Sequence, residues 1–189
     1  MTFSCHTISL LAAGLCLAAV SCVPGQPPPP PPRANLALCD WFDDQGPGEV
    51  AMTIRLSTQT AEVTRGGRLI GWTYVATGRE GFGTRPGNYR ITEKVVDKIS
   101  NRYGWTEDEF GNKINPAARF DDPVPPGQKY VPAPMPYWMR LTDYGIGMHA
   151  GPIPQPGQTA SHGCIRLPDD FAVALYEVAK LGTPVKIIR

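Results

Sequence analysis

The sequence predicts a mainly β protein with one firm helix near its C-terminus. Short stretches that alternate apolar and polar residues recur between residues 50 and 91, and strand-like stretches return between 137 and 148. Alternation of this kind is typical of strands that bury one face against a core. Glycine and proline account for 20 and 21 of the 189 residues, which favours many turns and few long helices.

The first strands are expected over residues 50–56, 59–64 and 68–75, where apolar and polar side chains alternate. Gly66-Gly67 separates the second from the third, as in a tight hairpin turn. A further strand is expected over 84–91, which opens on a Thr-Arg-Pro-Gly turn.

The middle of the chain is less regular. Residues 93–136 are charged and rich in turn residues, so we expect a functional loop or lid there. Short strands are expected again over 137–141 and 144–148, and a last one over 184–188.

The helix is expected over residues 169–180. Pro168 and two acidic residues stand at its start, where they suit the free amides and the helix dipole, and Gly182 follows its end. Its apolar face is formed by Phe171, Leu175 and Val178.

Size and charge limit the classes of partner. A chain of 189 residues holds one domain with a proper core. Lys and Arg total 18 against 17 acidic residues, so the net charge of +1 gives no reason to expect nucleic acid as a partner. No nucleotide, flavin or haem motif is present, and we expect neither a cofactor nor a metal.

The N-terminus has the pattern of an export signal. An apolar run over 8–20 is shorter than the ~20 residues that span a bilayer, and its length fits a secretory leader. Ala19-Val20-Ser21-Cys22 resembles a bacterial lipoprotein cleavage box, so we expect a leader at 1–22 and a lipid anchor on Cys22. The alternative is ordinary cleavage near Ser21, which gives a soluble exported protein. Either way the protein is expected in the bacterial cell envelope or periplasm.

A linker is expected over 23–48, followed by a folded domain over 49–189. The linker contains six consecutive prolines, 27–32, which form a stiff extended spacer. If Cys22 is lipidated, Cys39 and Cys164 are the remaining thiols. A disulfide between them is the less favoured alternative, because it would block Cys164.

The segment with the clearest chemistry is Ser161-His162-Gly163-Cys164-Ile165-Arg166, preceded by His149. A thiol, two imidazoles and a guanidinium within eighteen residues provide a nucleophile, a base and a cation for acyl transfer. A cysteine attacks as its thiolate, so it needs an imidazole in contact. The sequence does not distinguish the two histidines in this role.

Neighbouring residues are candidates for supporting roles. In an extended segment Arg166 lies on the same side as Cys164, where its guanidinium can bind a substrate carboxylate; a structural ion pair is the alternative. Amides near Gly163 and Cys164 are candidate oxyanion donors, and Ser161 is a candidate support for an imidazole. Tyr137 and Trp138 are candidates for the pocket wall, although one of them is expected in the core.

These residues carry a resemblance to a known family. His149 followed by Ser161-His162-Gly163-Cys164-Ile165-Arg166 resembles the signature of the L,D-transpeptidase catalytic domain, the YkuD fold. The Thr84–Tyr89 turn and Gly182-Thr183-Pro184-Val185 are similar to further family elements, so the resemblance covers residues 49–189. It implies a β-sandwich or barrel-like catalytic domain.

The resemblance also implies a cell-wall reaction. Cys164 would attack the third residue of a peptidoglycan tetrapeptide stem, release the terminal D-alanine, and pass the acyl group to an amine. That amine belongs to a second stem or to an anchored protein. The resemblance gives the base role to His149, with His162 in support, and implies that carbapenems acylate Cys164.

Three alternatives remain open. With water as acceptor, the same site would be an L,D-carboxypeptidase or endopeptidase. A non-catalytic wall-binding lipoprotein would keep the fold as a scaffold. A zinc site built from His149, His162 and Cys164 uses legitimate ligands, but the spacing is tight and no further histidine is available beyond the leader.

Overall fold

The computed structural model describes residues 37–43 and 45–189. The expected leader at 1–22, the lipid anchor at Cys22 and the proline run at 27–32 lie outside the described residues and stay predictions. No helix in the part of the chain that the structure describes is long and apolar enough to cross a membrane.

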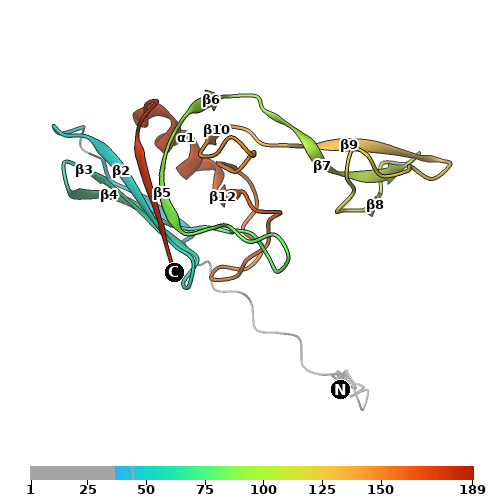
Figure 1. The fold of residues 1–189 in the computed structure, drawn as a ribbon, viewed down its shortest axis with the longest axis horizontal. Helices are drawn as coiled ribbons and strands as arrows, with labels where there is room; N and C mark the ends of the chain where they lie inside the picture. The colour runs from blue at the N-terminus through green and yellow to red at the C-terminus, as the bar shows by residue number, and fades with distance from the viewer. Residues whose placement is uncertain (1–36, 44) are drawn as a thin grey trace, which may run out of the picture. The chain divides into compact units, whose positions relative to one another are not determined.

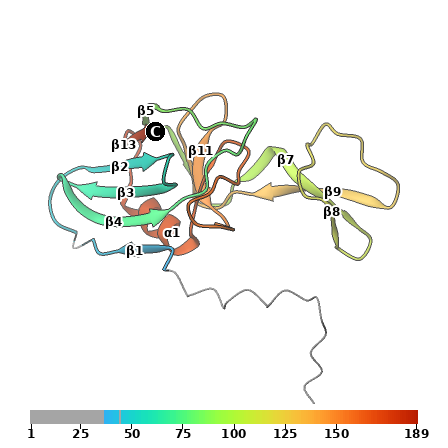
Figure 2. The same ribbon diagram turned by 90° about the horizontal axis from the view of Figure 1, so that it is seen from below.

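The largest sheet has six strands and forms one side of the folded unit (Figures 1 and 2). The turn at Gly66-Gly67 has positive φ angles of 56° and 82°, which glycine adopts without strain and which join the two strands as predicted. In spatial order the strands are β1 (Cys39–Trp41), β4 (Arg68–Tyr74), β3 (Thr60–Arg65), β2 (Val50–Arg55), β13 (Pro184–Ile188) and β5 (Gly87–Arg90).

Strand β1 lies inside the residues expected as a linker. Cys39 pairs with Thr73 and Trp41 with Gly71, so the edge of the large sheet is formed by residues before 49. The compact unit begins at Ala37. The linker expected over 23–48 therefore has to end earlier. A strand of three residues is too short to show an alternation of apolar and polar side chains in the sequence. Strand β1 is stabilised by its backbone pairing with β4.

A second sheet of four strands carries the signature residues. It consists of β12 (Ile165–Leu167), β11 (Gly147–Ala150), β10 (Trp138–Arg140) and β6 (Glu93–Val95). Strand β11 begins at Gly147, three residues later than expected, because Thr142–Gly145 forms a turn. The Thr142 hydroxyl accepts a hydrogen bond from the Ile146 amide at 2.8 Å and fixes that turn.

The prediction of an irregular loop over 93–136 is wrong. Besides β6, this segment forms a three-stranded sheet of β8 (Lys113–Asn115), β7 (Ile99–Asp108) and β9 (Gln128–Pro134). These three strands project away from the other sheets as an arm (Figure 1). The pairing of β7 with β9 shifts register between Ile99 and Gly104. Such irregularity and the many exposed residues of the arm hide the period-two pattern in the sequence.

The predicted helix is confirmed as α1 (Asp169–Val178), which begins at the expected residue and ends two residues earlier. Phe171, Ala172 and Leu175 are buried, whereas Val178 is only partly covered. The ammonium group of Lys94 in β6 donates to the carbonyl oxygens of Tyr176 and Ala179 at 2.5 and 2.6 Å. It thereby satisfies carbonyls at the end of the helix that have no partner within it.

The hydrophobic core joins the large sheet, the second sheet and α1. Its fully buried side chains include Met52, Ile54, Val63, Ile70, Met139, Met148, Ile165, Leu167, Phe171 and Leu175. Met148 and Ile165, which alternate with the signature residues, point into this core. The residues next to them along the strands, His149 and Cys164, are therefore held on the opposite face.

Candidate active site

Two parallel strands bring the signature residues together. In the pairing of β11 with β12, His149 lies directly opposite Arg166. A Cβ atom placed on Gly151 would lie 3.4 Å from Cγ and Cδ of Arg166 and 3.5 Å from Cε1 of His149. The imidazole and the stem of the arginine are therefore neighbours. Cys164 precedes β12 and lies two residues from Arg166, on the same side of an extended strand.

His149 is a buried, neutral imidazole, with 7% of its surface exposed. Its Nδ1 lies 2.7 Å from the carbonyl oxygen of Ala150. A carbonyl oxygen only accepts, so Nδ1 carries the proton, and the lone pair of Nε2 has no hydrogen-bond partner within residues 37–43 and 45–189. Burial lowers the pKa of His149 to about 4, with a smaller contribution from the Arg166 charge. The ring is therefore available as a base at neutral pH.

Cys164 is a protonated thiol in the resting protein. Burial raises the pKa of the Cys164 thiol, while the Gly147 amide and the Arg166 charge act in the opposite direction. The thiol donates to the carbonyl oxygen of Gly145, with Sγ 3.7 Å from that oxygen. Because the imidazole is also neutral, the site rests as a thiol and an imidazole, without the ion pair found in some cysteine enzymes.

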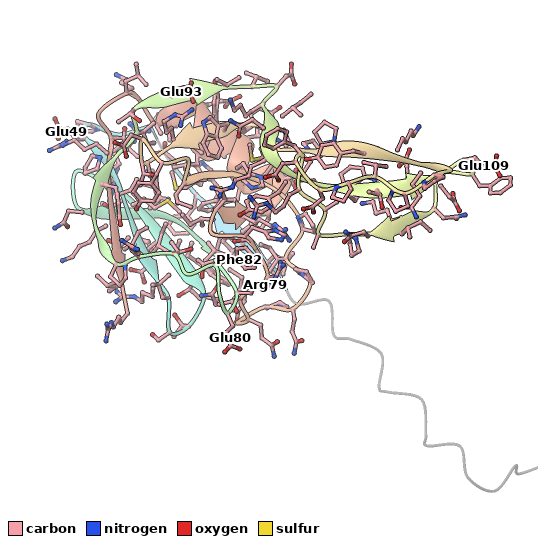
Figure 3. All side chains as sticks on the ribbon, turned by 45° about the vertical axis from the view of Figure 1, so that its right-hand side comes forward. Glu49, Arg79, Glu80, Phe82, Glu93 and Glu109 are labelled. Carbon is pink, nitrogen blue, oxygen red and sulfur yellow. The ribbon has the colours of Figure 1, made fainter. Side chains whose placement is uncertain are left out.

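His162 is held in a different environment. Its Nε2 lies 2.8 Å from Nη2 of Arg79. A guanidinium only donates, so Nε2 is the acceptor and the proton is on Nδ1. The ring stacks on Tyr103 of the arm at 4.4 Å between centroids and meets the edge of Phe82 at 4.8 Å. Burial, Arg79 and Arg166 lower the pKa of His162 to about 4. Figure 3 shows Arg79 beside Phe82.

Ser161 and Gly163 shape the loop before Cys164. The Ser161 hydroxyl donates to the Cys164 carbonyl oxygen at 2.5 Å and accepts from the Gly163 amide at 3.0 Å. Of the two candidate oxyanion donors, the Gly163 amide is therefore already bonded within the loop. Gly163 has a φ of 115°, a backbone conformation that residues other than glycine rarely adopt. Ser161 supports the loop rather than an imidazole.

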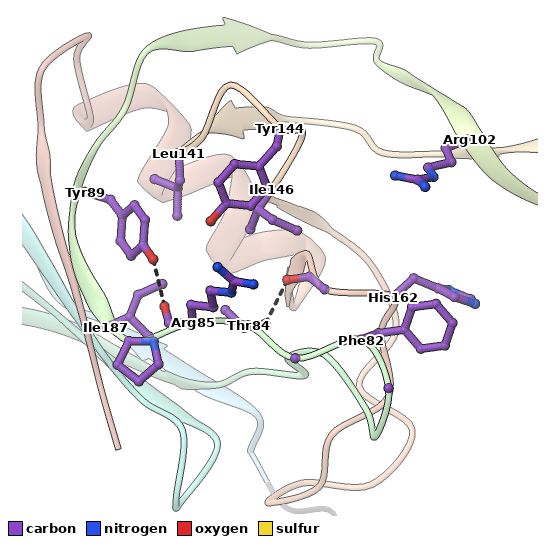
Figure 4. A pocket seen from close by; sticks show the side chains of 14 residues that line it. Phe82, Thr84, Arg85, Tyr89, Arg102, Leu141, Tyr144, Ile146, His162 and Ile187 are labelled. Atoms are coloured by element: carbon purple, nitrogen blue, oxygen red, sulfur yellow. Dashed lines mark hydrogen bonds between the residues drawn. The ribbon is translucent and has the colours of Figure 1, made fainter.

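A second chain segment fixes this loop from outside. The Thr84 hydroxyl donates to the Gly163 carbonyl oxygen at 2.7 Å and accepts from the Gly78 amide at 3.0 Å. Figure 4 shows the first of these bonds between two residues that line a neighbouring cavity of about 650 Å³. The segment from Gly78 to Thr84 thus packs around residues 161–163.

A buried amide anchors the same segment to the core. Gln59 is 2% exposed, and its side chain bonds both the backbone amide and the hydroxyl of Thr77. The Thr77 carbonyl oxygen in turn accepts the amides of Ala160 and Ser161, each at 3.0 Å. Gln59 therefore positions the loop that carries Cys164 through its hydrogen bonds to Thr77.

The signature residues open into a cavity of about 920 Å³ between the second sheet and the arm. Trp138 lines it, and its indole donates to Glu93 at 2.8 Å. Tyr137 is not among the lining residues, which corrects its expected place in the pocket wall. Its ring packs edge-on against Tyr176 of α1 at 5.6 Å. Tyr137 has a positive φ of 55°.

Sequence reasoning missed four residues that shape the site. Arg79, Phe82 and Tyr103 surround the His162 ring, and Thr84 bonds the loop. Thr84 belongs to the turn element already noted in the sequence, which was the available signal. The other three are far from the signature in sequence and show no local pattern.

Within residues 37–43 and 45–189, no group of three or more His, Cys, Asp or Glu side chains is close enough to hold a metal ion. Cys39 and Cys164 are both free thiols.

The fold is that of known L,D-transpeptidases. The L,D-transpeptidase from Mycobacterium smegmatis superposes with a TM-score of 0.59 at 21% identity, covering 75% of this chain and 59% of that one. L,D-transpeptidase 3 from Mycobacterium tuberculosis, solved with a faropenem-derived adduct, gives 0.57 at 23% identity, with 74% and 60% covered. The L,D-transpeptidase from Stackebrandtia nassauensis gives 0.54 at 23% identity, with 78% and 60% covered.

The family follows from the sequence as well. The model of the L,D-transpeptidase catalytic domain, YkuD, matches residues 49–187, and the chain belongs to this family. The chain spans 59% and 60% of the length of the solved structures named above. No curated protein sequence matches it.

Proposed function

We propose that this protein is a peptidoglycan L,D-transpeptidase that uses Cys164 as nucleophile and His149 as base. The observation that carries the proposal is the placement of these side chains. The thiol, an imidazole whose Nε2 is free, and the guanidinium of Arg166 all line one cavity at the edge of two parallel strands.

The first step is acylation by the donor stem. As a donor carbonyl approaches Sγ, the thiol proton passes to Nε2 of His149 and the S–C bond forms. Because the Gly163 amide is bonded to Ser161, the oxyanion donor is the Cys164 amide. The C–N bond to the terminal D-alanine then breaks, and its nitrogen takes the proton from His149. The products are a thioester on Cys164 and free D-alanine.

In the second step an amine attacks the thioester. Its N–C bond forms, the C–S bond breaks, and the proton lost by the amine returns to the sulfur through His149. An amine on a second stem gives a cross-link, and an amine on a protein gives anchoring. With water as the acceptor, the same site acts as an L,D-carboxypeptidase or endopeptidase.

His162, by contrast, supports the site rather than acting as the base. Its Nε2 accepts from Arg79 and its ring lies between Phe82 and Tyr103, so it joins the arm to the loop of Cys164. Arg166 binds a carboxylate of the substrate, and Trp138 forms part of the wall.

The proposed site of action is the bacterial cell envelope. The apolar run over 8–20 and the cleavage-box pattern ending at Cys22 support export and a lipid anchor, with the proline run as a spacer. Labelling with a fatty-acid analogue tests the anchor, because the Cys22→Ala variant should lose the label.

The function is tested by incubating the purified protein with disaccharide-tetrapeptide and analysing the products by mass spectrometry. Cross-linked dimers that depend on Cys164 support a transpeptidase, and tripeptide without dimers supports the hydrolase. Cys39→Ala is the matched control, since its thiol lies on strand β1 outside the cavity. Equal products from Cys164→Ala and wild type would overturn the proposal.

A further inference from the structure

The Arg166 guanidinium has no counter-charge in the described residues. No carboxylate pairs with it and its side chain forms no hydrogen bond anywhere in 37–43 or 45–189, although it is only partly exposed. Burial lowers the pKa of Arg166, and the nearby charge of Arg79 acts in the same direction. A desolvated guanidinium without a partner is costly, so this is a position where an anion is expected to bind.

Two other arginines that line the cavity have carboxylate partners, and a third, Arg102, is exposed to solvent and lies over the Tyr103 ring. Arg140 pairs with Glu93 at 2.9 Å, and Arg119 pairs with Asp121 at 3.1 Å. Arg79 donates to the ring of His162. Their donors are therefore at least partly satisfied, and the exposed Arg102 is solvated by water, whereas the partly buried Arg166 has no side-chain partner in the described residues.

The position of Arg166 relative to the base specifies which anion fits. Arg166 is the register partner of His149, and neighbouring strands lie about 4.8 Å apart. Both side chains contact the space beside Gly151. In an amino acid, the nitrogen and the carboxylate are attached to the same carbon. A nitrogen at Nε2 of His149 therefore leaves its own carboxylate within reach of the neighbouring guanidinium.

We propose that His149 and Arg166 form one subsite for an α-amino carboxylate, occupied first by the departing D-alanine and then by the acceptor. This inference rests on the proposed function. In acylation, Nε2 protonates the leaving nitrogen while Arg166 holds the carboxylate of the released D-alanine. Acylation breaks a C–N bond as the thioester forms, and transfer forms a C–N bond as the thioester breaks. The acceptor nitrogen therefore approaches from the side on which the nitrogen of D-alanine left.

The subsite selects the acceptor. An amine whose carbon also bears a carboxylate satisfies Arg166 and places its nitrogen at His149, where it loses a proton to Nε2 as the N–C bond forms. Free D-amino acids and the D-centre of a diamino acid in a second stem have this chemistry. The side-chain amine of a lysine in a protein lacks the adjacent carboxylate. The site thus favours stem cross-linking and D-amino acid exchange over protein anchoring.

Two matched pairs of compounds test the subsite. The donors are a tetrapeptide ending in D-alanine and the same peptide ending in D-alaninamide, and release of the C-terminal residue is measured. The acceptors are D-methionine and D-methioninamide, with rates divided by the fraction of unprotonated amine. The proteins are the wild type, Arg166→Gln, Arg166→Lys, and Arg55→Gln as a control on the exposed face of β2.

We expect the wild type to favour the carboxylate member of each pair by about tenfold or more, the size of a charge-assisted hydrogen bond. Arg166→Gln should bring both preferences to within about twofold, and Arg166→Lys should keep a part of each. Arg55→Gln should behave as wild type. Release of D-alaninamide by Arg166→Gln shows that this variant is folded and active. If it is inactive, the carboxylate-to-amide rate ratios of Arg166→Lys are compared with those of the wild type instead, and unchanged ratios overturn the inference.

The inference is overturned if Arg166→Gln keeps either preference, or if the wild type does not discriminate within the pairs while still releasing D-alanine. In that case the proposed transpeptidase stands without this subsite. If the wild type releases neither D-alanine nor its amide, the proposed function itself fails, and the subsite with it.

Discussion

Nη2 of Arg79 lies 2.8 Å from Nε2 of His162, and this contact distinguishes two imidazoles that look equivalent in the sequence. The nitrogen that His162 would need as a base already accepts a hydrogen bond. His149 instead uses Nδ1 to bond the Ala150 carbonyl oxygen, and its Nε2 has no partner in the part of the chain that the structure describes. This difference supports the proposed roles, proton transfer for His149 and positioning for His162.

Substitution of each histidine should show this difference. His149→Ala is expected to lower kcat/KM for D-alanine release by about 10²–10⁴, the usual contribution of a general base. His162→Ala is expected to lower it by about tenfold, because only positioning contacts are lost. Steady-state kinetics with a tetrapeptide measure both. An equal loss for the two variants, or a larger one for His162→Ala, would contradict the assignment.

The pH dependence should reflect a weakly basic imidazole. The pKa of His149 is lowered by burial to about 4, and the proposed mechanism uses the neutral ring. Activity should thus persist as the pH falls through 6.5 and decline only near 4. The profile of kcat/KM against pH measures this. Half-loss of activity near 6.5 would mean that the ring is hydrated in the working enzyme.

Alkylation provides an independent check of the resting state. Because burial raises the pKa of Cys164, its reaction with iodoacetamide should keep accelerating above pH 9. A rate that is already maximal at neutral pH would instead indicate a thiolate paired with an imidazolium. Peptide mapping separates Cys164 from Cys39.

The buried amide of Gln59 should matter for stability. Gln59→Leu removes the partner of the Thr77 amide and of the Leu56 carbonyl oxygen, and each buried unpaired group costs about 1–3 kcal/mol. We expect the free energy of unfolding, measured by urea titration, to fall by about 2–4 kcal/mol. Gln158→Leu, on an exposed loop, is the control and should change stability by less than about 0.5 kcal/mol. Equal stability of both variants would contradict this account.

A carbapenem should acylate the nucleophile. The resemblance to the L,D-transpeptidase family, to which the chain belongs, implies acylation of Cys164 by compounds of this class. We expect imipenem to add its mass to this protein once, on Cys164, and not to Cys164→Ala. Intact-protein mass spectrometry followed by peptide mapping checks this. An adduct on Cys39, or one that survives in Cys164→Ala, would argue against Cys164 as the acylated thiol.

The β-rich class, the helix after Pro168 and the family could be predicted from the amino-acid sequence. These depend on local patterns: alternation, helix-end residues and a compact signature from His149 to Arg166. It did not reveal the arm, because strands β7 and β9 are joined with a register shift and leave many residues exposed. It also assigned β1 to the linker, since three residues form a strand only when a partner strand is present.

The different environments of the two imidazoles, and the residues that surround them, could be found in the folded structure alone. Protonation and tautomer depend on burial and on partners distant in sequence, such as Arg79 for His162 and Gln59 for the loop of Cys164. The pairing of His149 with Arg166 likewise exists only between two folded strands. The residue types indicate which reactions the site can perform. The pKa values and the positions of these side chains depend on neighbours that only folding brings together.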